Sequence, residues 1–160
     1  KLAAARRVPV VIMHLRGTPR TMQRAPRYGQ VAADVKRELL ARARAAEAAG
    51  VRRGDIILDP GIGFGKTVRH NLQLLHHLDA LVAAGYPVLV GPSRKSFIAG
   101  VLGPRPARER DWGTAAAVAA AVAAGVQIVR VHDVAAMRQV AQVAWAIARE
   151  KLPLPGGARA

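Results

Sequence analysis

Four short apolar runs recur along the chain, and a helical pattern follows each of them. The runs are VPVVIM (8–13), IILD (56–59), PVLVG (87–91) and QIVRVH (127–132). None of them alternates apolar with polar residues, which is typical of strands covered on both faces, as in a parallel sheet. The sequence therefore predicts four buried parallel strands.

The segments between these runs are amphipathic or alanine-rich, and three of them end at a glycine, which is a common C-terminal helix signal. We expect helices over residues 30–50, 71–85, 96–102, 114–125 and 134–150, and a helix end over 2–7. Asp133 is placed to cap the last of them. Strand and helix alternating four times predict an α/β fold with right-handed crossovers.

Two architectures have this order of elements. One is an open doubly wound sheet, and the other is half of an eight-stranded (β/α)8 TIM barrel, whose usual length is about 250 residues. The helix end at 2–7, ahead of the first strand, favours a chain without the earlier βα units of a barrel. We expect one domain over 1–152 and a frayed tail over 153–160.

Composition excludes several classes of protein. In 160 residues about half are apolar, and charges, prolines or glycines interrupt every run before it reaches the ~18–20 residues of a membrane span. There is no cysteine and no secretory signal pattern, so we expect a cytoplasmic location without disulfides. The chain also does not begin with methionine, so we expect a fragment of a longer protein.

The net charge of +15 raises the possibility of a basic nucleic-acid-binding module. The arginines are scattered, however, and only two Phe, two Tyr and two Trp are available to stack on bases. A GC-rich genome would produce the same composition without such a function. We do not expect specific nucleic-acid binding, although the field of the surface favours anionic ligands.

In both architectures the chemistry lies at the carboxyl ends of the strands. The stretch LDPGIGFGKT (58–67) follows the second strand and resembles a phosphate-binding loop at first sight. The nucleoside-triphosphate loop needs a glycine where this chain has Pro60, and the dinucleotide fingerprint needs one at Lys66. Neither template fits, so this stretch is not expected to bind a nucleotide.

The informative residue of this stretch is Asp59, a carboxylate at the end of a buried strand and ahead of a glycine loop. Such a group can accept two parallel hydrogen bonds from a planar pair of N–H donors, as in an aminopyrimidine. The alternative is that Asp59 only caps the backbone N–H groups of its own loop.

The third strand exits into Ser93, Arg94, Lys95 and Ser96, where two cations and two hydroxyls open a short helix. Such a cluster suits an anionic or carbonyl-bearing ligand, because a helix N-terminus adds partial positive charge. The alternative is that both cations are solvated and that one serine is an N-cap.

The fourth strand exits at Arg130-Val131-His132, where alternation would place Arg130 and His132 on one side and Val131 on the other. An arginine in an apolar strand is costly unless paired, which points to a bound anion. His132 could also be a structural histidine. At the first exit we expect Met13 in the core and a hydrogen bond of His14 within its own loop.

Taken together, the four strand exits resemble those of the dihydropteroate synthase family of pterin-binding enzymes. The matching pieces are VVIMHLRGTPRTMQ, DIILDPGIGFGKTVRHNLQLL, VLVGPSRKSFI and IVRVHDV, in this order, and they span about residues 8–148. The resemblance implies a TIM barrel and a cytoplasmic transferase of folate biosynthesis that sulfonamides inhibit. By this resemblance, the enzyme would join 6-hydroxymethyl-7,8-dihydropterin diphosphate to p-aminobenzoate and release diphosphate.

The same resemblance implies a role for each matching residue. Asp59, Lys95 and Arg130 would contact the pterin, and Met13 would pack on its ring. The other implied contacts are p-aminobenzoate with Phe64, Ser96 and Lys95, and diphosphate with Arg130 and His132. Lys95, Arg130 and His132 would be the catalytic residues, stabilising the departing diphosphate.

The resemblance also implies that residues 1–152 are the C-terminal half of the barrel, inactive alone, and that the Mg2+ ligand of the family lies in the other half. We accordingly expect no metal site in this chain, two small-molecule substrates, no nucleic-acid or membrane partner, and a homodimer of the full-length enzyme. Three alternatives stay open: a pterin-binding methyltransferase domain, a basic nucleic-acid-binding module, and a non-catalytic half-barrel that pairs with a separate N-terminal half.

Overall fold

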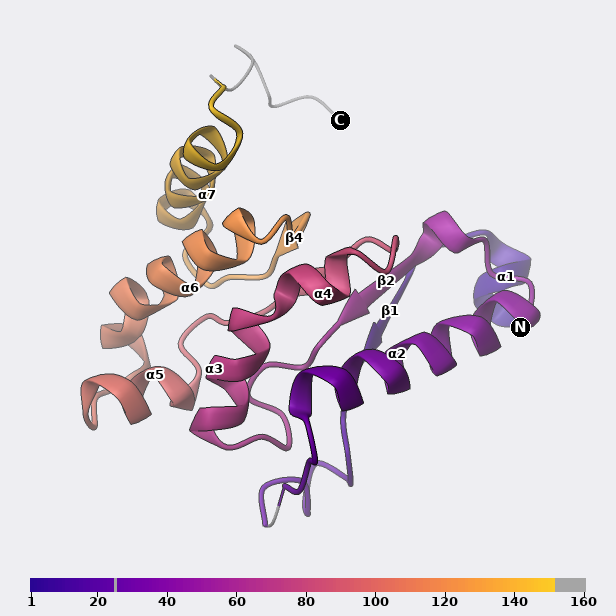
Figure 1. Ribbon diagram of the computed structural model, residues 1–160, viewed down its shortest axis with the longest axis horizontal. Helices are drawn as coiled ribbons and strands as arrows, with labels where there is room; N and C mark the ends of the chain where they lie inside the picture. The colour runs from indigo at the N-terminus through magenta and orange to yellow at the C-terminus, as the bar shows by residue number, and fades with distance from the viewer. Residues whose placement is uncertain (25, 152–160) are drawn as a thin grey trace.

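The computed structural model describes residues 1–24 and 26–151, in which four parallel strands are separated by helices (Figure 1). The strands are β1 (Val10–Met13), β2 (Ile56–Asp59), β3 (Leu89–Val90) and β4 (Ile128–Val129). The predicted parallel strands are confirmed, although β1, β3 and β4 are shorter than the apolar runs. The tail expected at 153–160 lies outside the described residues.

The order of the strands distinguishes the two architectures. β1 pairs with β2 and β3 with β4, and a parallel bridge between Leu58 and Val88 joins the two pairs. Strands that follow one another in the chain are therefore neighbours in space throughout the described residues. A doubly wound sheet reverses its strand order at one point, whereas a barrel does not. The observed order favours the barrel.

The helices follow the predicted periodicity, although some of their limits differ. They are α1 (Leu2–Arg6), α2 (Val31–Ala48), α3 (Val68–His76), α4 (Leu78–Val82), α5 (Ser96–Leu102), α6 (Asp111–Ala123) and α7 (Val134–Arg149), with 3-10 turns at Arg53–Asp55 and Ala107–Arg110. The single helix expected over 71–85 is two, α3 and α4, because the chain breaks at His77. α6 begins before residue 114, because the turn ahead of it leads directly into the helix.

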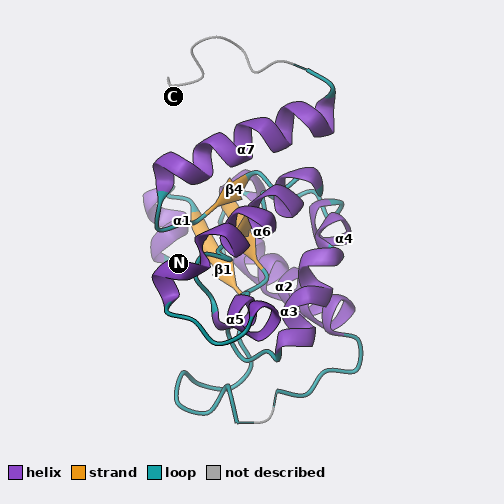
Figure 2. Cartoon of the chain, turned by 90° about the vertical axis from the view of Figure 1, so that its left-hand side faces the viewer, coloured by secondary structure: helices purple, strands orange, loops and turns teal. Residues whose placement is uncertain are grey.

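The core lies between the strands and the helices on one of their faces. Ile56 and Leu58 of β2 are completely buried, and they belong to one apolar cluster with Val35 and Leu39 of α2. Figure 2 shows α2, α3 and α4 on the same side of the strands. This arrangement places alternate strand residues against the helices, as expected for a barrel wall.

The opposite face of the strands is open in the described chain. Val11 of β1 is 51% exposed, and its parallel partner Ile57 is only partly buried. The prediction that both faces of the strands are covered is therefore wrong for these residues. The apolar runs have no alternation because both faces carry apolar side chains, and only one face has helices over it here.

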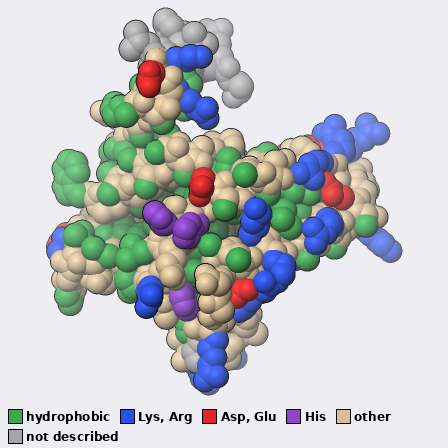
Figure 3. Space-filling view, in the orientation of Figure 1, with side chains coloured by type: hydrophobic (Ala, Val, Ile, Leu, Met, Phe, Trp, Pro, Cys, Tyr) green, Lys and Arg blue, Asp and Glu red, His purple; other side chains and the backbone are tan. Residues whose placement is uncertain are grey.

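The surface of the molecule is rich in arginine and lysine. In Figure 3 these side chains gather over the end of the molecule that holds α1 and over the loop between β1 and α2. Several of the arginines are paired with carboxylates: Arg16, Arg37, Arg52, Arg53 and Arg94. Among the described residues no helix is both long and apolar enough to cross a membrane.

Candidate functional site

A pocket of about 280 Å³ lies at the carboxyl ends of the four strands. Its walls are formed by Met13, Asp59, Phe64, Gly91, Ser93, Lys95, Arg130, Val131 and His132. Every strand exit that the sequence nominated therefore contributes to one cavity. All the predicted site residues line it except Ser96, which is exposed at the first position of α5.

Asp59 lies beside Met13, its partner in the parallel pairing of β1 and β2. Its Oδ1 accepts a hydrogen bond from the Gly61 N–H at 2.7 Å. One oxygen of Asp59 therefore caps the backbone of its own loop, which was the alternative predicted for this residue. Oδ2 has no hydrogen bond with the described residues, so the carboxylate keeps acceptor capacity toward the pocket.

The ionisation of Asp59 is set by opposing effects. The pKa of Asp59 is raised above its usual value, because burial raises it more than the Gly61 N–H and then the charges of Lys66, Lys95 and Arg130 lower it. The three cations favour the charged form of Asp59. A charged carboxylate can accept two hydrogen bonds from N–H groups.

The glycine loop after Asp59 is shaped by close packing. Gly61 and Gly63 have φ of 68° and 81°, which side chains rarely adopt. A Cβ on Gly61 would lie 2.1 Å from the carbonyl oxygen of His14, and one on Gly63 would lie 2.9 Å from Cδ of Lys95. These glycines let the loop pack against the exit of β1 and against Lys95, which accounts for them without a bound phosphate.

Three successive carbonyls of this loop are held by side chains. The donors are Gln23 Nε2 to Gly63 O at 2.8 Å, Lys66 Nζ to Phe64 O at 3.0 Å, and Tyr28 Oη to Gly65 O at 3.0 Å. Asn71 of α3 accepts the Gly63 N–H at 2.7 Å. The loop is therefore fixed on several sides, and Phe64 is carried by it into the wall of the pocket.

Phe64 and Lys95 form a second part of that wall. The Lys95 Nζ lies 3.9 Å from the centroid of the Phe64 ring, within the range of a cation–π contact. Burial lowers the pKa of Lys95, Asp59 raises it, and Arg130 lowers it. An aromatic ring beside an ammonium group offers a flat apolar surface with a positive rim, which suits an aryl carboxylate.

His132 is oriented by a serine that the sequence did not assign to it. The buried Ser93 Oγ lies 2.8 Å from His132 Nδ1 and accepts the His132 backbone N–H at 3.2 Å. The serine hydrogen is then available to Nδ1, which leaves the proton on Nε2. Only its place directly after the third strand marked Ser93 as a candidate for this role.

Arg130 reaches the pocket by a different route from the one predicted. β4 ends at Val129, so Arg130 lies beyond the strand and is exposed. It is not the costly arginine within an apolar strand that the sequence predicted. The predicted alternation is also wrong, because Arg130, Val131 and His132 all line the pocket. Its guanidinium has no hydrogen bond or ion pair with the described residues, which leaves it available to an anion.

Arg94 and the two serines do not act as the sequence suggested. Arg94 has φ of 58°, and its guanidinium pairs with both oxygens of Asp111 at 2.8 Å, so it is neither free in solvent nor part of the pocket. The N-cap of α5 is Lys95, with no side-chain cap, so the alternative that a serine caps this helix is wrong. The predicted cap of α7 is confirmed, since Asp133 accepts the Ala136 N–H at 3.0 Å.

His14 is fully buried and bonds across elements, not within its own loop as expected. Its Nε2 lies 3.0 Å from Oε2 of Glu38 on α2, and its Nδ1 lies 3.2 Å from Lys66 Nζ. Burial, followed by the charge of Lys66, lowers the pKa of His14 to about 4. From the sequence, Lys66 had no role beyond a phosphate-loop template that did not fit.

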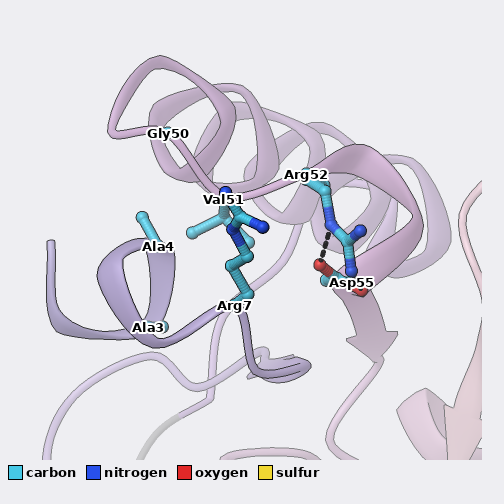
Figure 4. Close-up of a pocket in the computed structure, with 7 residues that line it drawn as sticks. All are labelled: Ala3, Ala4, Arg7, Gly50, Val51, Arg52 and Asp55. Carbon is cyan, nitrogen blue, oxygen red and sulfur yellow. Dashed lines mark hydrogen bonds and ion pairs between the residues drawn. The ribbon is translucent and has the colours of Figure 1, made fainter.

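Two other kinds of site are not supported. Within residues 1–24 and 26–151, no three His, Cys, Asp or Glu side chains come together in a group that could hold a metal ion. A second pocket, of about 330 Å³, lies between α1 and the start of β2 (Figure 4). There Arg52 is paired with Asp55 at 2.6 Å, at the strand ends away from the site.

The fold and the pocket define an enzyme class. The strand ends of this α/β unit carry a carboxylate, two cations and an aromatic ring. The family described as pterin binding enzyme matches residues 1–132, and the chain belongs to that family. Within it, the chain is a homologue of dihydropteroate synthase. It is 47% identical over 148 residues to the dihydropteroate synthase of Synechocystis sp., an alignment that covers 92% of this chain.

Solved structures agree with this assignment. The dihydropteroate synthase of Thermus thermophilus, in complex with 4-aminobenzoate, superposes with a TM-score of 0.85 at 47% identity over 91% of this chain and 59% of the other. The Xanthomonas albilineans enzyme, in complex with 7,8-dihydropteroate, gives 0.84 at 41% identity over 94% and 54%. The chain spans about half the length of the relatives it matches, 51% for the Synechocystis enzyme.

Proposed function

We propose that this chain provides the last four βα units of a (β/α)8 barrel, over residues 1–152, and the substrate-binding residues of a dihydropteroate synthase. The reaction joins 6-hydroxymethyl-7,8-dihydropterin diphosphate to p-aminobenzoate, and its products are 7,8-dihydropteroate and diphosphate. The observation that carries the proposal is the single pocket that brings Asp59, Phe64, Lys95, Arg130 and His132 together.

Each group in the pocket has a distinct part in this reaction. Asp59 accepts the N–H groups of the aminopyrimidine edge, and Met13, beside it in the sheet, packs on the pterin ring. Arg130 and the Nε2–H of His132 receive the diphosphate, and Lys95 reaches both substrates from the wall between them. Phe64 offers its ring to the arylamine, with Ser96 at the rim of that site.

The chemistry needs no covalent intermediate with the protein. The bond between the pterin methylene carbon and the diphosphate oxygen breaks, and both electrons leave with the diphosphate. The neutral amine nitrogen of p-aminobenzoate then bonds to that carbon and releases a proton. Arg130 and His132 stabilise the charge that develops on the departing oxygen, which is where fixed positive groups are most effective. No step is assigned to magnesium.

Binding of a p-aminobenzoate mimic tests this function against that of a pterin-binding methyltransferase. A sulfonamide added to the chain in a calorimeter should bind only when diphosphate and a pterin are present. The bound pterin and diphosphate would complete the surface that Phe64 and Lys95 offer to the sulfonamide. A methyltransferase would bind the pterin without any sulfonamide site, and that result would overturn the proposal. Steep salt-dependent binding of DNA without pterin binding would instead favour a nucleic-acid module.

A further inference from the structure

Lys66 is a buried lysine that the proposed reaction does not use. It is only 4% exposed, and its Nζ donates to the Phe64 carbonyl at 3.0 Å. Its second contact is His14 Nδ1 at 3.2 Å, and it forms no ion pair within 4.0 Å among the described residues. A buried ammonium group without a direct carboxylate is costly, so its position calls for a reason beyond packing.

The contacts of Lys66 form a chain that leads away from the pocket. An ammonium group only donates, so Nδ1 of His14 must accept and Nε2 must carry the proton that goes to Glu38. The other oxygen of Glu38 is bound by Arg16. Glu38 therefore interacts directly with Arg16 and His14 and not with Lys66. The positive charge of Lys66 faces the strand exit.

At that exit the group on which Lys66 acts is Asp59. A Cβ built on Gly61 would lie 3.4 Å from Lys66 Nζ, and the N–H of the same glycine is bound to Asp59 at 2.7 Å. The two charged groups therefore both lie close to the same glycine. Burial lowers the pKa of Lys66 to about 8, and the charge of Asp59 opposes this more than any other neighbour does, while Arg16 lowers the pKa and Glu38 raises it.

We propose that Lys66 is a positioning residue for the pterin site: held by His14 and the Phe64 carbonyl, its buried charge keeps Asp59 in the ionised form that accepts the pterin N–H groups. The inference rests on the proposed function for the identity of the ligand. Lys95 and Arg130 also face Asp59, but both border the open pocket and are engaged by substrate, whereas Lys66 is buried behind the loop.

Carbon NMR of the aspartate carboxyls tests the inference without any ligand. Lys66→Gln removes the charge and keeps a donor for the Phe64 carbonyl, and it should raise the pKa of Asp59 by about one unit. Lys66→Arg keeps the charge and should leave the pKa of Asp59 near that of the wild type. Lys36→Gln on α2 is the matched control, and an equal pKa in all four proteins would overturn the inference.

The reciprocal measurement keeps the test valid even where a Lys66 variant does not fold. Asp59→Asn should lower the pKa of Lys66 further below about 8, by the same amount, because the coupling of two sites is mutual. An unchanged Lys66 titration would contradict the inference. Since both titrations are made on the free protein, a failure to bind pterin would count against the proposed function alone.

Binding shows whether the coupling matters to the ligand. In the wild type, affinity for the pterin diphosphate should fall as Asp59 takes up a proton, and Lys66→Gln should move this acid limb upward by the same one unit or so. Lys66→Arg should restore it. A glutamine variant that weakens binding equally at every pH would indicate a merely structural role and would overturn the inference.

Discussion

At the scale of single residues, we propose that Asp59 carries the selectivity of the site. Its Oδ1 already accepts the Gly61 N–H, so an amide at this position would have to turn its NH2 group toward the pterin edge. Asp59→Asn should therefore weaken binding of the pterin diphosphate by roughly 10- to 100-fold, the effect of a lost hydrogen bond to a charged group. Calorimetric titration measures this directly.

Asp133→Asn is the matched control for that experiment. Asp133 caps α7 through Ala136, and asparagine is as good an N-cap as aspartate. Its pterin affinity should equal that of the wild type. If the two variants lost affinity to the same extent, the role of Asp59 in reading the pterin edge would be contradicted.

His14 makes the stability of the fold depend on pH. Its pKa in the folded chain is about 4, compared with 6.5 for a free histidine, chiefly because it is buried. Between these values the unfolded chain binds more protons than the folded one, so the free energy of unfolding rises from pH 4 to pH 6.5. The contribution of His14 to stability is complete above pH 6.5, and acid removes about 3 kcal/mol of it.

Urea denaturation between about pH 4 and pH 7 tests this dependence. His14→Gln should lower stability at neutral pH, because it disturbs the contacts with Glu38 and Lys66, but it should remove the part of the acid slope that His14 causes. His76→Gln, at an exposed histidine, should keep the wild-type slope. A His14→Gln protein with the full acid slope would show that other groups produce it.

Most of the pocket could be predicted from the sequence, because a residue at the end of a parallel strand has only one region to point into. Asp59, Lys95 and His132 were found in this way. The sequence could not show which of Ser93 and Ser96 lines the pocket, because the left-handed backbone of Arg94 turns the chain between them. The position of Lys66 could not be predicted, because it depends on a contact with His14, which is 52 positions away in the chain.

At the scale of elements, the glycine loop is the part of the fold least tolerant of side chains. Gly61→Ala would place a Cβ against the backbone oxygen of His14, whereas Gly63→Ala would meet the flexible side chain of Lys95. Both positions have positive φ, which alone costs about 1–3 kcal/mol. We expect Gly61→Ala to lower the free energy of unfolding more than Gly63→Ala, and only the latter to fold well.

Gly54→Ala in the 3-10 turn is the control, because nothing lies within 4 Å of its Cβ position and its φ is not positive. It should be close to neutral in urea denaturation. Gly63→Ala should in addition weaken sulfonamide binding, since the methyl group displaces Lys95 from Phe64. Equal stability of all three variants would contradict the role assigned to the loop.

Helix and strand limits could be predicted only where a local signal fixes them. α5 occupies the expected residues 96–102, whereas α3 begins before residue 71 because Thr67 and His70 form a reciprocal cap. A threonine followed by histidine three positions later is not the usual capping pair, so the pattern did not predict this start. β3 and β4 are shorter than their apolar runs because pairing ends where the exits turn toward the pocket.

At the scale of the whole molecule, the described residues leave one side of the site uncovered. Val11 of β1 is half exposed on the face that carries Met13 and Asp59, and this face has no helices over it. An apolar strand face in contact with water indicates a surface that is covered in the working enzyme. The relatives of known structure are nearly twice as long, with 54% of the Xanthomonas enzyme covered.

We therefore expect the 160 residues on their own to bind pterin diphosphate weakly and to give no measurable turnover with both substrates. In the proposed reaction the pocket provides the groups for the pterin edge and for the diphosphate. A ligand in it stays open to water on the uncovered side, where charge stabilisation is weak. An assay of dihydropteroate formation, run beside a full-length relative, measures this.

Adding the part of the Thermus thermophilus enzyme that this chain does not cover, as a separate polypeptide, should restore turnover. The added part would cover the open strand face and pair with the free edges of β1 and β4. The same mixture made with the Asp59→Asn chain should stay inactive, which attributes the activity to this pocket. Turnover by the isolated chain near that of the full-length relative would show that the open face needs no cover, and the half-barrel assignment would be wrong.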